Sequence, residues 1–280
     1  MGNYCYFNGA IIKEVDAKVG VTDLGLRRAY GAFDFLRAEG VFPLFIEHHL
    51  VRFKKALKSL RIPIKEDEHR LQEIVNELLT LNNYKNSGLR FIATGGYSED
   101  SYHPTTPNFF ITNDPIGSPA KELYSEGVDL MLLPHKRELA NYKTINYLTP
   151  IFHLEKMHKE LFYDQLYHDK GIISEASRAN FFVVINQTLY TPKEGVLEGV
   201  TRKMVLQIAK EQQIPVKITD VSLSDLTKAS EAFMCSTTKR VLPVTKVDHQ
   251  EVGDGKVGKM TKRLMSLFAE MEQFYIDAHA

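Results

Sequence analysis

Apolar residues recur at spacings of three and four in two segments of the N-terminal half of the chain. In the first segment, Leu50, Phe53 and Leu57 repeat in this way and predict an amphipathic helix over about residues 47–60. The same spacing predicts a second helix over residues 67–80. Short apolar runs around these helices predict strands over residues 4–7, 10–12, 89–94 and 108–112.

The C-terminal half alternates apolar runs typical of strands with helical patterns. Strands are predicted over residues 128–133, 180–185, 189–191, 216–219 and 231–236. Helices are predicted over residues 150–161, 201–212 and 259–275. The densest cluster of turn-forming residues in the chain, residues 113–119, separates the two halves. The pattern therefore predicts a two-domain α/β or α+β protein, with domains over residues 1–117 and 118–280.

The composition of the 280-residue chain is typical of a globular protein. Lys plus Arg and Asp plus Glu both number 35, so no overall charge would attract nucleic acid or a membrane, and we expect a small-molecule partner. The two cysteines, Cys5 and Cys235, are too far apart for a CxxC motif. The sequence starts without a secretory signal pattern, and no apolar run approaches the ~18 residues of a membrane span. We expect a cytoplasmic protein.

Lys143 lies in the segment ANYKTINYL, among apolar and small polar residues and without an acidic neighbour. Burial disfavours the ammonium form, so a lysine in such surroundings is easier to deprotonate and can attack an aldehyde carbon. This is the chemistry of a Schiff-base lysine. Taken alone, however, such a segment more often marks a surface lysine at the end of a strand.

Two segments offer groups that could hold a phosphate ester. Val200 and Thr201 lie at the start of a predicted helix, where unpaired backbone amides and a threonine hydroxyl are available. Ser236, Thr237 and Thr238 follow a predicted strand and can donate both hydroxyl and amide hydrogens to oxygens. The alternatives are ordinary N-capping by Thr201 and a plain turn at the triplet.

Arg52 and Glu175 are candidate charged partners of such a ligand. Arg52 lies away from the apolar stripe of its predicted helix and can reach out of the core, although a solvated arginine is the usual outcome there. Glu175 precedes the strand predicted over residues 180–185 and could pair with a protonated pyridine nitrogen. The alternative for Glu175 is an exposed loop residue.

Five short motifs, in this order, resemble the class IV, fold-type IV pyridoxal-phosphate aminotransferases. They are HxxR at residues 49–52, KxxNYL at 143–148, SEAS with a following Asn at 174–180, GVTR at 199–202 and STT at 236–238. The resemblance covers essentially the whole chain. It implies a small α/β N-terminal domain and a larger C-terminal domain resembling a barrel. The family contains branched-chain L-aminotransferases, D-amino-acid transaminases and aminodeoxychorismate lyases.

The resemblance also implies a role for each matching residue. Lys143 would form a Schiff base with the aldehyde of pyridoxal 5'-phosphate and move the proton during the reaction. Glu175 would bind the pyridine nitrogen, and Tyr147 the ring hydroxyl. The residues that would hold the phosphate are Arg52, Val200, Thr201 and Thr237. The family further implies a homodimer in which each active site borrows a loop of the small domain from the partner subunit.

The expected substrate depends on which residues bind the α-carboxylate. In the L-selective branch, backbone amides of the turn matching Thr237 and Thr238 hold it; in the D-selective branch, side chains of the small domain do so. The usual D-branch arginine falls on Gly95 here, but Arg90 and Arg28 lie on small-domain segments and could form a substitute pair. The alternatives are that Arg28 is exposed and that Arg90 pairs with an internal acid.

Because of these arginines, the lysine-to-asparagine spacing and the STT triplet, we expect a D-amino-acid transaminase acting on D-glutamate or D-alanine. The acceptor would be 2-oxoglutarate or pyruvate. Arg90 also matches an arginine that, in some L-branch members, receives the side-chain carboxylate of glutamate. A branched-chain L-amino-acid aminotransferase therefore remains the first alternative, followed by an aminodeoxychorismate lyase and by a non-enzymatic binding protein with the same fold.

Two other motifs compete with this interpretation. Residues 253–258 satisfy GxGxxG and precede a predicted helix, but they follow a polar segment rather than a buried strand, which disfavours a dinucleotide site. The pairs His48 and His49, and His153 and His158, do not share a helix face as the ligands of an HExxH zinc site do. We therefore expect no metal site.

Overall fold

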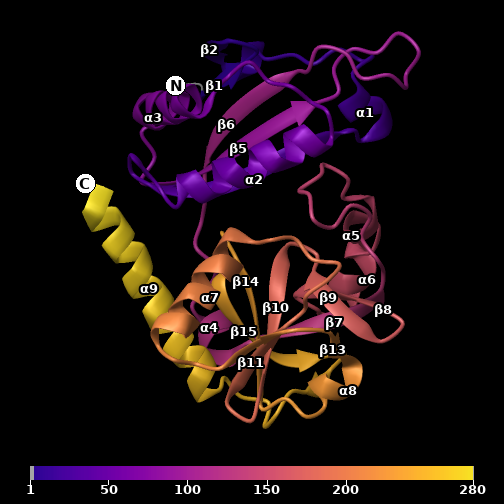
Figure 1. Cartoon of the computed structure of the whole chain (residues 1–280), viewed down its shortest axis with the longest axis vertical. Coiled ribbons are helices and arrows are strands. Elements are labelled where there is room, and N and C mark those ends of the chain that lie inside the picture. Colours follow the sequence, from indigo (N-terminus) through magenta and orange to yellow (C-terminus); the bar gives the residue numbers. More distant parts are fainter. Residues whose placement is uncertain (1–2, 280) are drawn as a thin grey trace. The chain divides into compact units, whose positions relative to one another are not determined.

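The computed structural model describes residues 3–279, which form two compact units. The first unit contains the chain up to Gly117, the segment Tyr142–Asn146 and the end of the last helix from Tyr275. The second unit contains Ser118–Asn141 and Tyr147–Phe274. Figure 1 shows both units, with many of their elements labelled. Each unit has its own sheet and its own hydrophobic core.

The first unit is built on a six-stranded antiparallel sheet with the strand order β2-β1-β6-β5-β3-β4. Its strands are β1 (Tyr4–Phe7), β2 (Ala10–Lys13), β3 (Gly31–Glu39), β4 (Phe42–Pro43), β5 (Asn86–Thr94) and β6 (Phe109–Pro115). Its helices are the 3₁₀ turn η1 (Glu14–Asp16), α1 (Leu24–Arg28), α2 (Ile46–Ser59) and α3 (Glu68–Asn82). The hairpin of β1 and β2 turns at Asn8 and Gly9, which both have positive φ, as their sequence predicts.

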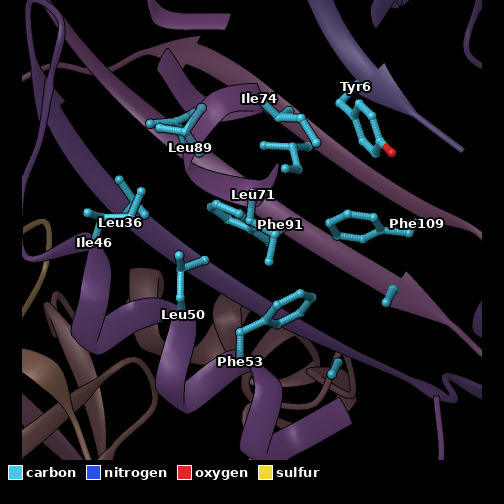
Figure 2. Packing of buried hydrophobic residues seen from close by; sticks show 14 of the residues in the cluster. Tyr6, Leu36, Ile46, Leu50, Phe53, Leu71, Ile74, Leu89, Phe91 and Phe109 are labelled. Atoms are coloured by element: carbon cyan, nitrogen blue, oxygen red, sulfur yellow. The ribbon is translucent and has the colours of Figure 1, made fainter. Parts of the chain in front are cut away.

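Helices α2 and α3 cover one face of this sheet and bury their apolar stripes against it (Figure 2). Leu50 and Phe53 from α2, and Leu71 from α3, are at most 1% exposed, as is Phe91 on β5. Burying one such side chain contributes about 1.5–3 kcal/mol relative to leaving it exposed. The periodicity in the sequence therefore located both helices correctly, because their burial depends on one stripe facing one sheet.

The edge of β3 is covered by a segment that arrives from far along the chain. β4 pairs only with the end of β3, at Ala38 and Glu39. The segment Tyr142–Asn146 pairs with the beginning of β3: Phe33 donates its amide to the carbonyl of Lys143 (2.8 Å), and an isolated bridge joins Ala32 and Thr144. A lysine that the sequence marked as chemically unusual is thus held by backbone pairing.

The second unit is built on a ten-stranded mixed sheet that closes on itself. Its strands are β7 (Val128–Pro134), β8 (Asp164–Asp169), β9 (Ile172–Ala176), β10 (Ala179–Ile185), β11 (Thr188–Thr191), β12 (Val216–Ile218), β13 (Val221–Ser222), β14 (Glu231–Ser236), β15 (Arg240–Val247) and β16 (Gln250–Glu251). The order β10-β14-β15-β7-β8-β9 returns to β10 through the pairing of β9 with β10. This closed ring agrees with the barrel-like domain that the family resemblance implied.

Six helices accompany this barrel along the chain. They are α4 (Glu122–Glu126), α5 (Leu148–Phe152), α6 (Leu154–Lys159), α7 (Val200–Glu211), α8 (Leu223–Leu226) and α9 (Lys259–His279). The core of the unit includes Leu166, Phe181, Met234 and Leu242, each fully buried. No helix within residues 3–279 combines the length and the apolar character needed to cross a membrane.

The start of α9 explains the GxGxxG segment without a dinucleotide. The Glu231 carboxylate accepts hydrogen bonds from the first amides of α9, those of Met260 (3.0 Å) and Thr261 (2.7 Å). A Cβ on Gly258 would lie 1.9 Å from the carboxyl carbon of Glu231. The amides that a pyrophosphate would need are therefore already used by a carboxylate of the same unit.

Several elements differ from the sequence prediction. The helix predicted over residues 150–161 is two short helices, α5 and α6, that meet at His153. Leu148, Ile151 and Phe152 on α5 are exposed, so no buried stripe requires one continuous helix. The prediction omitted β3, β8 and β9, whose apolar residues are interrupted by polar or charged ones, and β15, which contains Pro243.

Candidate active site

Lys143 lies on the segment that pairs with the edge of β3, and its side chain is half-buried. Hydrogen bonds on either side hold its backbone: its carbonyl accepts from Phe33, and Ile145 donates to the carbonyl of Gly31 (3.1 Å). The Nζ atom lies 4.4 Å from the centroid of the Phe33 ring. A cation over an aromatic face is stabilised by about 0.5–2 kcal/mol, so Phe33 helps to fix the ammonium group.

The Arg52 side chain is held by Asp34, a buried residue of β3. Nε of Arg52 lies 2.8 Å from Oδ2 of Asp34, and Nη2 lies 2.7 Å from Oδ1, which makes a bidentate ion pair. Burial raises the pKa of Asp34, but Arg52 and His49 more than offset this effect and hold that pKa far below its usual range. Asp34 is therefore a carboxylate.

His49 completes this buried cluster. Its Nδ1 atom lies 2.7 Å from Oδ1 of Asp34. Burial lowers the pKa of His49, and the opposing effect of Asp34 does not reverse the shift. We assign His49 as neutral, with its proton on Nδ1 and donated to Asp34. The charges of Asp34 and Arg52 then balance, and the N–H groups of Arg52 not used by Asp34 remain suited to an anion.

Glu175 lies within β9 and is 5% exposed, so it is not the exposed loop residue of the alternative interpretation. Its Oε1 atom accepts from Nε of Arg137 (2.9 Å), and its Oε2 atom accepts from the amide of Leu197 (2.8 Å). Asn180, opposite Glu175 in the β9–β10 pair, adds a longer contact from Nδ2 to Oε2 (3.3 Å). A carboxylate with these donors stays ionised.

Helix α7 begins with amides that no side chain caps. Gly199 is the N-cap residue and makes no side-chain cap hydrogen bond. Val200 and Thr201 follow as the first helical residues, and both are 5% exposed. A Cβ on Gly199 would lie 2.0 Å from Oδ1 of Asn180, so only glycine fits there. Uncapped amides at the start of a twelve-residue helix form a ready anion site.

Ser236, Thr237 and Thr238 lie at the end of β14 and in the turn to β15. Thr237 is half-buried and Thr238 is exposed. The next residue, Lys239, is 6% exposed, and its Nζ atom lies 3.6 Å from Oδ2 of the buried Asp164. Burial lowers the pKa of Lys239, and Asp164 partly offsets this effect. The motif thus sits beside a buried ion pair that the sequence did not reveal.

Tyr147, the residue expected to bind a ring hydroxyl, immediately precedes α5 and is half-buried. It belongs to the second unit, as do Glu175, the start of α7 and the Thr237 turn. Lys143 and Arg52 belong to the first unit. Within the second unit, Asn180 connects two of the predicted sites, because it contacts Glu175 and also donates to the carbonyl of Leu197 (2.8 Å).

Arg90 and Arg28 are both exposed. Arg90 points away from the buried face of β5, and its Cζ atom lies 5.4 Å from the centroid of Phe35, its neighbour on β3. Among residues 3–279, no acidic side chain pairs with Arg90, in contrast to the alternative interpretation. Arg28 ends α1 and donates to the carbonyl of Arg27 (3.0 Å). No contact in the described chain joins Arg28 to Arg90.

Gly95, at the position of the usual D-branch arginine, has no room for a side chain. A Cβ there would lie 2.8 Å from Cδ1 of Tyr30 and 3.0 Å from Cδ1 of Leu24. The Gly95 amide also donates to the carbonyl of Tyr30 (3.0 Å). Any carboxylate-binding group in this region must therefore come from other positions.

Comparison with known proteins identifies the family. The family model for class IV aminotransferases matches residues 31–247 of the chain. The chain belongs to the class IV aminotransferases. A putative branched-chain-amino-acid aminotransferase of Methanocaldococcus jannaschii is 30% identical over 278 residues, 95% of each chain. A D-alanine aminotransferase of Staphylococcus epidermidis is 28% identical over 282 residues, 98% of each chain.

Among solved structures, the branched-chain amino acid aminotransferase of Escherichia coli superposes with a TM-score of 0.90 at 26% identity. The superposition covers 97% of this chain and 95% of the other. The two-unit fold with its closed sheet is thus the fold-type IV architecture, and this class IV aminotransferase depends on pyridoxal phosphate. Relatives at similar identity are named as a putative branched-chain-amino-acid aminotransferase and as a D-alanine aminotransferase. The comparisons therefore establish the family and leave the substrate open.

The residues present suit this cofactor. The uncapped start of α7 offers amides to its phosphate, and Glu175 offers an ionised carboxylate to a ring nitrogen. Lys143 offers a fixed, half-buried amine to its aldehyde. Asp34 contacts Arg52 within the first unit, and Arg137 and Asn180 contact Glu175 within the second. The sequence did not predict these three residues as site residues, because their partners are distant in sequence or lie on strands that the pattern did not predict.

Proposed function

We propose that this class IV aminotransferase exchanges amino groups between D-amino acids, such as D-glutamate and D-alanine, and 2-oxo acids, such as 2-oxoglutarate and pyruvate. One observation carries the proposal. Arg90 is exposed and no acid in residues 3–279 pairs with it, while Gly95 has no space for the usual arginine. An arginine fork without an acid partner is suited to bind a substrate carboxylate in bidentate fashion.

In this proposal each residue has a defined role. Lys143 binds the cofactor and carries the proton that moves during transfer, and Glu175 holds the ring nitrogen. Tyr147 holds the ring hydroxyl. Arg52, Val200, Thr201 and Thr237 hold the phosphate, and Arg28, Arg90 and Thr238 contact the substrate. When bound, pyridoxal phosphate supplies an aldehyde for amine exchange and a ring that withdraws electrons from the substrate.

The second candidate is a branched-chain L-amino-acid aminotransferase. The relative from M. jannaschii with 30% identity is named as a putative enzyme of that kind. In that case the turn at Thr237 and Thr238 would bind the α-carboxylate, and Arg90 would receive the side-chain carboxylate of glutamate. The lyase activity is less well supported, because the lyase structure that resembles this chain is 23% identical and shares the fold alone.

We further propose a cytoplasmic homodimer. Exposed apolar side chains such as Val21 (75% exposed) and Leu26 (69%) belong to the chain segment that includes Arg28. Covering them with a partner subunit would remove apolar surface from water and bring the Arg28 segment to a neighbouring molecule. Sedimentation of the cofactor-loaded protein tests this expectation, since a monomer at micromolar concentration would contradict it.

A single-turnover experiment tests the proposed function. Holoenzyme is mixed with one amino acid at a time, without an acceptor, and the cofactor absorbance is followed. D-glutamate and D-alanine should convert the cofactor faster than L-leucine and L-glutamate. Faster conversion by the L-amino acids would establish the second candidate instead. Lys143→Ala should lose the covalent attachment and turnover while keeping the fold; a variant that still transaminates at the parent rate would rule out Lys143.

A further inference from the structure

Arg137 is a charged partner of Glu175. Its Nε and Nη2 atoms both lie 2.9 Å from Oε1 of Glu175. The Arg137 side chain is 20% exposed and the Glu175 side chain 7%, so water screens the pair only weakly. Nη2 of Arg137 also donates a short hydrogen bond to the carbonyl of Ala140, three residues before Lys143 in the sequence.

The other oxygen of Glu175 is held by the segment that leads into α7. Oε2 accepts from the amide of Leu197 and, at longer range, from Asn180. Asn180 donates to the carbonyl of Leu197 as well, and its Oδ1 atom fills the space where Gly199 lacks a side chain. The carboxylate therefore has one fixed orientation, because donors on both oxygens oppose any rotation about its last torsion.

We propose that Arg137 is a positioning residue that orients Glu175 and keeps it ionised for the cofactor ring nitrogen. This inference rests on the proposed role of Glu175. An opposite charge within about 4–6 Å favours the ionised form of a carboxyl group by roughly one to three pH units. The same guanidinium also binds the carbonyl of Ala140, so hydrogen bonds to Glu175 and to the backbone hold it in place.

Arg137→Gln tests this assignment, with Lys136→Gln as its matched control. Lys136 is the preceding residue, its side chain is 75% exposed, and it faces Asp169 at 3.8 Å. In Arg137→Gln, the dissociation constant for pyridoxal phosphate should rise about 10- to 100-fold, because a hydrogen bond to a charged group is lost. The acid limb of the single-turnover rate should move to higher pH by about one to three units.

The pH profile separates positioning from general support of the fold. A merely structural arginine would lower the amount of folded protein without moving the acid limb. Arg137→Lys keeps the charge but loses the fork, so it should weaken cofactor binding and leave the acid limb close to the parent value. Glu175→Gln replaces the carboxyl group with an amide that cannot ionise. In a protein that already carries this change, adding Arg137→Gln should not move the acid limb any further.

Two outcomes would overturn the inference while leaving the proposed function intact. One is an Arg137→Gln protein whose cofactor affinity and acid limb both equal those of Lys136→Gln. The other, should Arg137→Gln not fold, is an Arg137→Lys protein with the parent's cofactor affinity. Failure of the proposed function is a distinct result, because the parent protein itself would then not bind pyridoxal phosphate or would not react with amino acids.

Discussion

The guanidinium of Arg52 meets the carboxylate of Asp34 through two hydrogen bonds, of 2.8 Å from Nε and 2.7 Å from Nη2. Asp34 is 1% exposed, so this carboxylate is ionised only because Arg52 and His49 surround it. Its ionisation contributes to stability above its unfolded pKa of about 3.9 and is lost as pH falls through the lower folded pKa. The pKa of His49 is lowered in the folded protein, so the unfolded chain binds a proton at this residue more readily. This difference reduces the free energy of unfolding as pH falls below about 6.5, the pKa of an unperturbed histidine.

Asp34→Asn should therefore destabilise the first unit by about 3–5 kcal/mol at pH 7, because Arg52 is left without its buried partner. The difference from the parent should shrink below about pH 4, where the parent loses the contribution of the carboxylate. Hydrogen exchange of α2 amides between pH 3 and 7 measures both effects. Glu77→Gln, at an exposed position of α3, is the control. A difference that stays constant to pH 3 would show that the charge of Asp34 is not responsible.

Arg90→Ile should lower kcat/KM for D-glutamate or D-alanine by roughly 30- to several-thousand-fold, the range for truncating one partner of a desolvated charge pair. Arg28→Ile should give a similar or smaller loss. Cofactor absorbance should persist in both, since neither residue is proposed to hold the cofactor. Arg70→Gln, a surface arginine paired with Glu73, should retain the parent value. Equal losses in all three variants would argue against a specific carboxylate site.

Gly199→Ala should weaken cofactor binding and destabilise the second unit by about 1–3 kcal/mol, because its Cβ would overlap Oδ1 of Asn180. Displacement of Asn180 would remove contacts to Glu175 and Leu197 together. Gly117→Ala is a clean control, since a Cβ there meets no atom within 4 Å. Calorimetry of the apoprotein and cofactor titration measure the two effects; parent-like values in both would contradict the steric argument.

Lys239→Met should cost about 3–5 kcal/mol, because it leaves the carboxylate of Asp164 buried without a charge partner. Asp164 Oδ2 accepts no hydrogen bond, which makes Lys239 its principal compensation in the described structure. The double variant Lys239→Met with Asp164→Leu should recover most of this loss. Thermal unfolding of the three proteins tests the pair. If the double variant is less stable than either single one, the two side chains do not act as a pair.

The spacing of apolar residues predicted the elements that bury a single stripe of apolar side chains. Helices α2 and α3 have such stripes, and they begin and end within two residues of the predicted bounds. Strand β3 lacks one, because the buried Asp34 and Arg37 interrupt its apolar residues. A charged residue interrupts the apolar pattern from which a strand is predicted, unless the partner that allows its burial is known. For Asp34, that partner lies on another element.

The candidate site likewise contains residues that the sequence singled out and residues that only the folded structure reveals. Short motifs that resemble the family singled out Lys143, Glu175 and the start of α7 as candidate residues, and their roles stay predictions. Arg137 lies in a polar segment without regular structure, and only folding brings it to Glu175. The sequence likewise indicated that Gly95 lacks the usual arginine but not that Tyr30 and Leu24 leave no space for any side chain.

The pairing of Tyr142–Asn146 with the edge of β3 has a consequence for biosynthesis. A nascent chain that ends near Gly117 contains every strand of the first sheet but not the segment that covers the beginning of β3. Unpaired strand edges recruit other chains, so this intermediate is vulnerable to aggregation until the later segment emerges from the ribosome. The segment that carries Lys143 thus protects the nascent sheet, and this contribution is separate from the role proposed for the Lys143 amine.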